Sequence, residues 1–245
     1  MLPTKVSTQI KHSSWTARDA WRCLLWAFVG EMFIVFVVVL ATRVVPNFTY
    51  WILSPKGTFF VFYLGMLPPL IWILWSARAD SVTALLGRLG LLAPPGKPGL
   101  AGILFGAGLG TLATYVASWV RLPESALTVR FVGAPIVKQL YLMVMFLTGP
   151  FVEELIMRGF LYRAFRNTYG FVGATTFVLL VAGFTHMDVV FKSLWGLFFI
   201  MSGNVAFCYV REKSPSLWDC ILCHVAYNGV IAVNILWVVL KSVNR

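Results

Sequence analysis

Long uninterrupted apolar runs constrain this chain more than any other feature. Seven of them, at residues 21–45, 58–75, 99–120, 132–157, 170–190, 192–210 and 216–240, are each long enough to cross about 30 Å of hydrocarbon as a helix. Soluble domains show apolar runs of only about 4 to 14 residues. We therefore predict an all-α, polytopic transmembrane bundle of about seven to eight helices, formed as a single integral membrane domain over residues 1–245.

The composition excludes two other classes of protein. Apolar residues make up 59% of the chain and charged residues 12%, whereas a soluble domain carries roughly a quarter charged residues and a disordered chain is less apolar still. The net charge of +11 would favour nucleic-acid binding in a soluble protein. Here the basic residues cluster between the apolar runs, so we interpret them as topology signals facing an anionic leaflet and expect no nucleic-acid partner.

The charge distribution also predicts the orientation. The first 20 residues are a polar tail, and the apolar run that follows is too long for the core of a signal peptide, so it is expected to remain as an anchor. Twelve of the 20 basic residues fall on the side of the N-terminus. By the positive-inside rule we expect an inner-membrane protein with a cytoplasmic N-terminus.

Three further patterns carry structural predictions. The connection at 76–98 has an apolar period that is typical of a helix lying on the membrane surface. Gly102, Gly106 and Gly110, spaced four residues apart, predict close packing between helices. The four cysteines lie in apolar surroundings and are expected to be reduced core residues.

Ionisable residues inside the spans point to function, because each costs several kcal/mol in hydrocarbon. Glu154 and Arg158 stand at i and i+4, in the order that favours an ion pair. Glu153 lies about 100° round the same helix and lacks that cation. We expect Glu154 and Arg158 to brace the helix, and Glu153 to be available as a general base.

Two histidines and an amide fall in other spans. His224 and Asn228, at i and i+4, project from one face of the last span. Counted at about 1.5 Å per residue from the nearest inner basic residues, Glu153 lies roughly 15 to 20 Å deep, His224 roughly 16 Å and His186 roughly 24 Å. Antiparallel helices would bring these groups to a similar level inside the bilayer.

The motif Glu153-Glu154-x-x-x-Arg158, a histidine about thirty residues later (His186) and a final His224-x-x-x-Asn228 resemble the CPBP family of intramembrane proteases, also called the ABI family. This family includes the type II CAAX prenyl proteases. The resemblance covers residues 135–235, which would hold the catalytic core. The chain departs from the family's usual Phe-x-x-x-His motif, because position 182 is Ala and the nearest aromatic residue is Phe184.

The resemblance implies a helical membrane enzyme that cuts peptide bonds near the cytoplasmic side of the membrane. By this resemblance Glu153 and His186 activate the attacking water, His224 and Asn228 stabilise the oxyanion, and Glu154 with Arg158 supports the helix. The chemistry is consistent, since amide hydrolysis needs a base for water and donors aimed at the developing oxyanion. The expected partners are membrane lipid and a membrane-associated or prenylated peptide or protein substrate, with no cofactor; the oligomeric state is not set by the sequence.

Other interpretations remain open. One glutamate and two histidines could form a zinc site, so a divalent metal is the alternative cofactor. Cys220-x-x-Cys223-His224 matches the pattern of covalent haem attachment, although it is embedded in an apolar run. Buried charges also mark ion pathways in transporters, and a scaffold or immunity protein could keep the fold without cutting anything.

Overall fold

Every element in the described part of the chain is helical. The structure is a computed structural model, and it describes residues 15–77, 81–119, 136–190 and 193–243. The elements are α1 (Ala17–Val44), α2 (Phe48–Ile52), α3 (Pro55–Ser76), α4 (Val82–Leu89), α5 (Lys97–Trp119), α7 (Ile136–Glu154), the π-helix η1 (Leu155–Leu161), α8 (Tyr162–Thr185), α9 (Met187–Val190), α10 (Leu194–Lys213) and α11 (Leu217–Val243). Among the described residues, five helical segments are long and apolar enough to cross a membrane. The prediction of a polytopic helical bundle is confirmed.

The long helices follow the seven predicted runs, with one boundary that differs clearly. The fifth run was expected to begin at residue 170, but α8 already begins at Tyr162. Gly170 has φ 73° and ψ −176°, so it bends the helix there. Only glycine adopts this backbone conformation without strain, and residues 162–169 can therefore form a separate helical segment below the bend.

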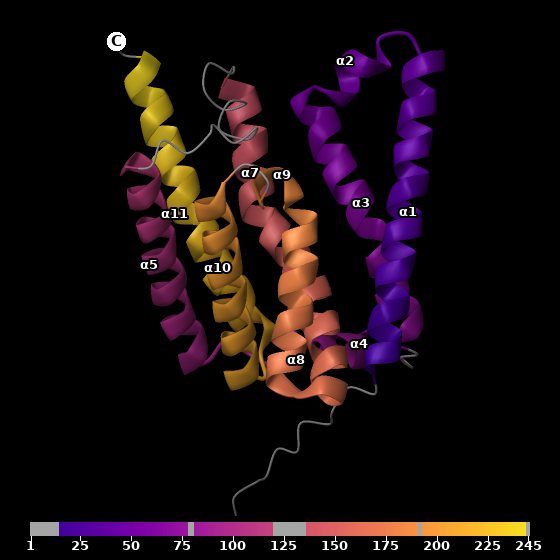
Figure 1. The fold of residues 1–245 in the computed structure, drawn as a ribbon, viewed down its shortest axis with the longest axis vertical. Coiled ribbons are helices and arrows are strands. Elements are labelled where there is room, and N and C mark those ends of the chain that lie inside the picture. The colour runs from indigo at the N-terminus through magenta and orange to yellow at the C-terminus, as the bar shows by residue number, and fades with distance from the viewer. Residues whose placement is uncertain (1–14, 78–80, 120–135, 191–192, 244–245) are drawn as a thin grey trace, which may run out of the picture.

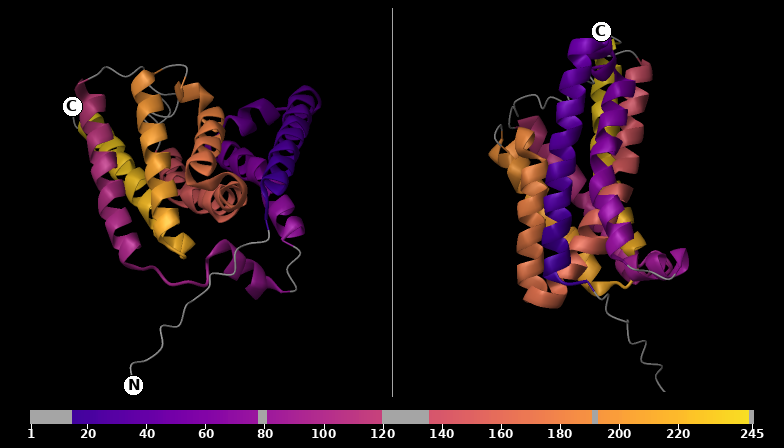
Figure 2. Two further views of the ribbon diagram at one scale, coloured as in Figure 1. Left: turned by 60° about the horizontal axis from the view of Figure 1, so that its bottom comes forward. Right: turned by 90° about the vertical axis from the view of Figure 1, so that its right-hand side faces the viewer.

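Successive long helices cross the bundle in alternating directions (Figures 1 and 2). α1, α5, α8 and α11 start at the end of the bundle where the N-terminal segment enters, at the bottom of Figure 1. Among the described residues, this end carries Arg18, Arg22, Arg88, Lys97, Arg163, Arg166, Arg211 and Lys213, and we call it the basic end. Arg43 and Lys56 lie at the opposite end, near α2.

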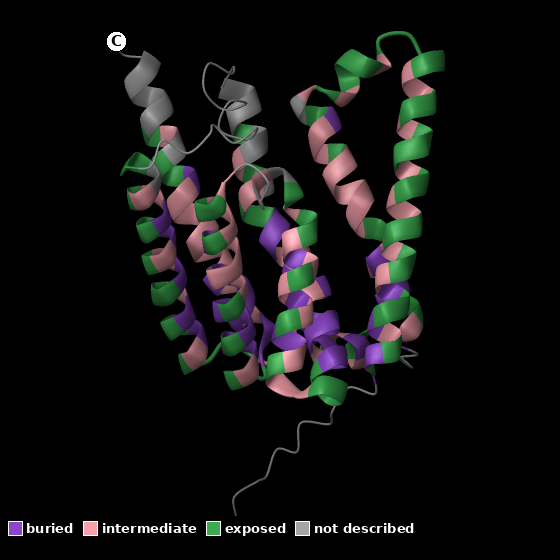
Figure 3. Ribbon diagram, in the orientation of Figure 1, coloured by how far each residue is buried: buried purple, intermediate pink, exposed green. Residues whose placement is uncertain are grey.

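Burial is concentrated towards the basic end, whereas the outward faces of the helices are apolar and exposed (Figure 3). Trp15 and Phe160 are buried there with ring centroids 5.0 Å apart, and they belong to the main core cluster. α4 lies across this end and buries Leu85 and Leu89, so a short helix with one buried apolar side lies within 76–98, as the apolar period predicted. All four cysteines are buried and unbridged, as predicted.

The glycine stripe of α5 packs against α11. A Cβ atom at Gly106 would overlap the carbonyl oxygen of Cys223, and one at Gly110 would lie 2.7 Å from the carbonyl oxygen of Tyr227. These contacts confirm the packing prediction and show its purpose. The stripe lets α5 support the part of α11 that carries His224 and Asn228.

Replacing Gly106 by Ala is expected to destabilise the bundle by about 1–3 kcal/mol, because the added methyl group forces α5 and α11 apart. The matched control is Gly108→Ala. No atom lies within 4 Å of a Cβ atom at Gly108, and alanine is the better helix former there. Thermal unfolding in detergent measures both changes, and an equal midpoint for the two variants would contradict the packing argument.

Candidate active site

The predicted Glu-Glu-x-x-x-Arg motif lies where α7 changes into a π-helix. α7 ends at Glu154, and η1 runs from Leu155 to Leu161 with Arg158 at its centre. π-helical turns inside α-helices are rare and occur frequently at functional sites. The wider turn presents Glu154 and Arg158 to the interior, where Glu154 is 0% and Arg158 1% exposed.

Arg158 is held from three directions. Its Nη1 donates to Oε1 of Glu154 at 2.9 Å, which forms the predicted ion pair. Its Nη2 donates to the side-chain oxygen of Asn204 at 2.6 Å and to the backbone carbonyl of the same residue at 3.2 Å. The guanidinium also lies 5.2 Å from the ring centroid of Phe207. These contacts fix Arg158 between η1 and α10.

His224 meets both carboxylates of the motif. Its Nδ1 lies 2.8 Å from Oε1 of Glu154, the same oxygen that accepts from Arg158. Its Nε2 lies 3.9 Å from Oε2 of Glu153. A carboxylate in an ion pair with Arg158 accepts hydrogen bonds, so Nδ1 of His224 is the donor to Glu154, and Nε2 faces Glu153. The ring also stacks on Phe207 with centroids 4.5 Å apart.

Glu153 is the accessible member of the pair. Its side chain is 23% exposed, compared with 12% for His224 and 0% for Glu154. Gly149, one turn earlier in α7, leaves room beside it, since a Cβ atom there would lie 3.6 Å from Oε1 of Glu153 and 3.4 Å from the ring of Phe62 in α3. Glu153 is therefore the more exposed of the two carboxylates, whereas Glu154 is enclosed.

Asn228 lies one turn beyond His224 on the same face of α11, as its spacing predicts. Its Nδ2 donates to the backbone carbonyl of Phe146 in α7 at 3.1 Å. A carboxamide nitrogen carries two hydrogens. One of them fixes the side chain against α7, and no hydrogen bond within the described residues uses the other.

His186 occupies a different environment from the other predicted residues. It follows the last residue of α8, and its Nδ1 lies 2.9 Å from the carbonyl oxygen of Ala182 and 3.1 Å from Oγ1 of Thr185. A carbonyl only accepts, so Nδ1 donates to it, and in the neutral imidazole the lone pair is then on Nε2. Among the described residues, no hydrogen bond or ion pair joins His186 to Glu153 or His224. The contact with Ala182 is made by its backbone, so it does not require the family's usual phenylalanine.

Two residues of the site were missed by sequence reasoning. Asn204 and Phe207 stand on one side of α10, where they contact Arg158, and Phe207 also contacts His224. Asn204 was detectable as a lone amide inside an apolar run, a position where an unpaired polar group is costly. Phe207 could not be recognised from the sequence, because it is one of 20 phenylalanines in an apolar chain.

The arrangement of the possible metal-binding side chains is relevant to the two alternative cofactors, a divalent metal ion and covalently attached haem. In the described part of the chain, no group of three or more His, Cys, Asp or Glu side chains is arranged to hold a metal ion. Within the site, Glu154 already accepts from both Arg158 and His224. Cys220 and Cys223 are 0% exposed, so the thiols of the haem-like pattern are packed inside the bundle and away from any attachment surface.

A comparison with known protein families finds a match over the part of the chain that contains this site. Residues 135–230 match the family model described as type II CAAX prenyl endopeptidase Rce1-like. The match covers less than half of the chain but spans Glu153, His186, His224 and Asn228. Neither the curated proteins nor the solved structures contain a match to the chain. The resemblance to the CPBP family is confirmed over residues 135–230, and this match supports CAAX-type intramembrane endopeptidase activity in general terms.

Proposed function

We propose a metal-free glutamate mechanism for peptide-bond hydrolysis inside the membrane, starting from the match of residues 135–230 to the Rce1-like family of type II CAAX prenyl endopeptidases. The observation that carries the proposal is the approach of Nε2 of His224 to Oε2 of Glu153 at 3.9 Å, with Nδ1 of the same ring held by Glu154. This spacing admits a water molecule hydrogen-bonded to both groups, since each hydrogen bond needs about 2.8 Å.

Glu153 is the general base in this proposal. It takes a proton from the water as the water oxygen attacks the scissile carbonyl carbon, and it returns that proton to the leaving amide nitrogen. Glu154 cannot replace it, because it is buried and paired with Arg158. Two adjacent carboxylates thus have separate roles, set by their different partners.

The oxyanion is stabilised by His224 and Asn228. The second amide hydrogen of Asn228 is not needed by Phe146, and it points from the same helix face as the imidazole. His224 is placed to donate through Nε2 when both of its ring nitrogens carry protons. Two donors of this kind supply the charge stabilisation that amide hydrolysis requires.

His186 is proposed to assist Glu153 in positioning the water, through the lone pair on its Nε2. The proposal rests on the family resemblance together with the tautomer that its contact with Ala182 imposes. His186→Ala is the variant that checks this role. A cleavage rate equal to that of the wild type would remove His186 from the mechanism.

The proposed substrate is a membrane-associated peptide or protein, with a prenylated C-terminal segment as the first choice. The outward faces of the helices are apolar, so a substrate anchored in lipid reaches the bundle without leaving the membrane. The basic end is proposed to face the cytoplasm, because positively charged segments concentrate on that side. The alternative is a transport, scaffold or immunity protein that keeps this fold without cleaving substrates.

The test is cleavage of membrane-anchored peptides by the purified protein in detergent, with and without a strong chelator. Prenylated and unprenylated peptides of one sequence form a matched pair. We expect cleavage of the prenylated peptide at a rate that the chelator leaves unchanged. Loss of cleavage with chelator and recovery with zinc would replace the glutamate mechanism by a metal site. No cleavage of any peptide would favour the non-proteolytic alternative.

A further inference from the structure

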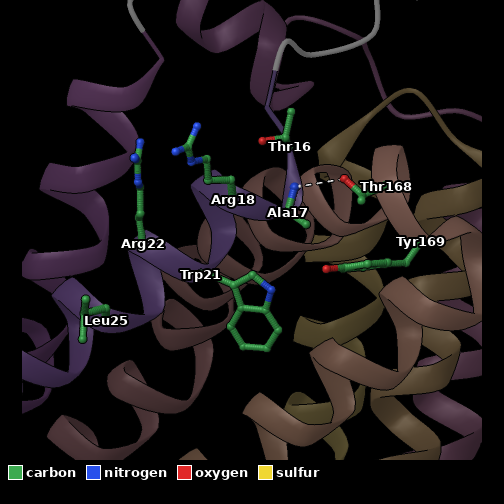
Figure 4. Close-up of a pocket in the computed structure, with 8 residues that line it drawn as sticks. All are labelled: Thr16, Ala17, Arg18, Trp21, Arg22, Leu25, Thr168 and Tyr169. Carbon is green, nitrogen blue, oxygen red and sulfur yellow. Dashed lines mark hydrogen bonds between the residues drawn. The ribbon is translucent and has the colours of Figure 1, made fainter.

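A groove lies between the first turns of α1 and the first segment of α8, at the basic end of the bundle (Figure 4). It has a volume of about 680 Å³, and the residues that matter for its chemistry are Arg18, Trp21, Arg22, Leu25, Thr168 and Tyr169. None of the proposed catalytic residues lines it. It is therefore a separate feature, and the proposed mechanism makes no use of it.

Two guanidinium groups at this groove have no acidic partner among the described residues. Arg18 and Arg22 stand at i and i+4 of α1, and both are exposed. In the described part of the chain, neither forms a hydrogen bond or an ion pair with another residue. Asp19, the nearest acid in sequence, instead accepts from the backbone N–H and the hydroxyl of Thr16. Two cations on one helix face, with no counter-ion in the described part of the chain, favour a bound anion.

The groove is amphipathic along the direction of α1. In Figure 4 the guanidinium groups of Arg18 and Arg22 point towards one end of the groove, while Trp21 and Leu25 lie towards the other. Trp21 is 46% and Leu25 63% exposed, so both present apolar surface to a ligand. Charged groups at one level and aromatic and aliphatic groups just below it match the headgroup and upper acyl chain of a phospholipid.

The walls of the groove are fixed by contacts between the two helices. The N–H of Ala17 donates to Oγ1 of Thr168 at 3.1 Å, which joins the first turn of α1 to α8. The Trp21 ring packs edge-on against Phe165 at 5.3 Å and Phe177 at 5.1 Å. The hydroxyl of Tyr169 is directed towards Trp21 and supplies a further hydrogen-bond donor. A ligand would therefore meet a groove that is already formed.

We propose that this groove binds the phosphate headgroup of an anionic phospholipid from the leaflet at the basic end, with its acyl chain against Trp21 and Leu25. Arg18 and Arg22 bind the phosphate oxygens, and the charge complementarity selects an anionic over a zwitterionic headgroup. The apolar floor selects a lipid over a free phosphate ion. Lipid bound here would hold the start of α1 to α8, beside the junction that Thr168 and Trp21 already make.

The test uses the full-length protein in detergent micelles and phosphatidylglycerol with dibrominated acyl chains, which quench nearby tryptophan fluorescence. The part of the signal that belongs to Trp21 is the difference between the wild type and Trp21→Phe. We expect Trp21 to be quenched by the phosphatidylglycerol and not by phosphatidylcholine with the same chains. In the variant Arg18→Gln/Arg22→Gln, half-maximal quenching should need at least tenfold more lipid.

The matched control is Lys97→Gln/Lys213→Gln, which removes the same charge from exposed positions at the same end, outside the groove. The proposal is supported if this control needs the same lipid concentration for half-maximal quenching as the wild type, and only the arginine variant needs more. Equal shifts in the two variants, or equal quenching by phosphatidylcholine, would overturn it. Millimolar inorganic phosphate that relieves the quenching would also overturn it, since the site would then prefer the free anion.

Discussion

Replacing Glu153 by Gln is expected to lower the rate of peptide-bond cleavage by roughly 10²–10⁴-fold, because glutamine keeps the shape of the side chain but cannot accept a proton from water. The bundle should fold as before. Glu153 is 23% exposed and takes no part in the hydrogen bonds of Arg158, so its neutralisation leaves no buried cation unpaired. Initial cleavage rates and thermal unfolding midpoints of the purified variant measure the two effects separately.

Glu212→Gln is the matched control for this experiment. Glu212 also belongs to an ion pair, with Arg166 at 2.8 Å, and it lies at the basic end outside the proposed site. Its replacement should leave the cleavage rate unchanged. A wild-type rate for Glu153→Gln would end the assignment of Glu153 as the base.

The variant Glu154→Gln further distinguishes the role of Glu154 from that of Glu153. Oε1 of Glu154 accepts from both Arg158 and Nδ1 of His224, so this variant should lose stability as well as activity. If the two glutamates were interchangeable, Glu153→Gln and Glu154→Gln would lower the cleavage rate and the unfolding midpoint by similar amounts.

Much of the fold was predictable from the sequence, because hydropathy reports directly which segments favour lipid over water. The runs at 21–45, 58–75 and 99–120 correspond closely to α1, α3 and α5. The early start of α8 was not predictable from hydropathy, because residues 162–169 include Arg163 and Arg166, and the bend depends on the backbone of Gly170. Hydropathy also does not register the change from α- to π-helix at Leu155.

The sequence predicted which residues belong to the site, but it did not predict which of them contact one another across different helices. Spacing placed Glu154 with Arg158, since both lie on one helix, and the structure has this ion pair. Spacing could not show that Nδ1 of His224 meets Glu154, because this contact joins α11 to α7 and depends on how the helices pack. The same limit applies to Asn204 and Phe207, whose importance lies entirely in partners on other helices.

Removing the guanidinium in Arg158→Met is expected to destabilise the bundle by about 3–5 kcal/mol, the largest effect on stability predicted for this chain. Glu154 would remain fully buried without its cation, and Asn204 would lose the donor to its side-chain oxygen. Arg158→Lys should recover only part of the loss. A lysine keeps the charge, but it lacks the planar fork that reaches Glu154 and Asn204 together. The midpoint of thermal unfolding in detergent measures these losses.

The control is Arg166→Met, which removes an arginine from another ion pair only eight residues away. The side chain of Arg166 is 42% exposed, so its pair with Glu212 is screened by solvent and should contribute about 0–1 kcal/mol. The expected difference between the variants follows from burial, since both ion pairs have nearly the same length. Equal losses would show that Arg158 does not experience the low-polarity environment that its 1% exposure implies.

The double variant Glu154→Leu/Arg158→Met tests whether the buried pair acts through stability or through the site. Removing both charges leaves neither unpaired, so much of the stability lost in Arg158→Met should return. Cleavage should not return, because Nδ1 of His224 would have no acceptor to fix the ring opposite Glu153. Stability restored without activity would identify Glu154 as the residue that positions His224. Recovery of both would show that the ion pair of Glu154 and Arg158 only stabilises the fold.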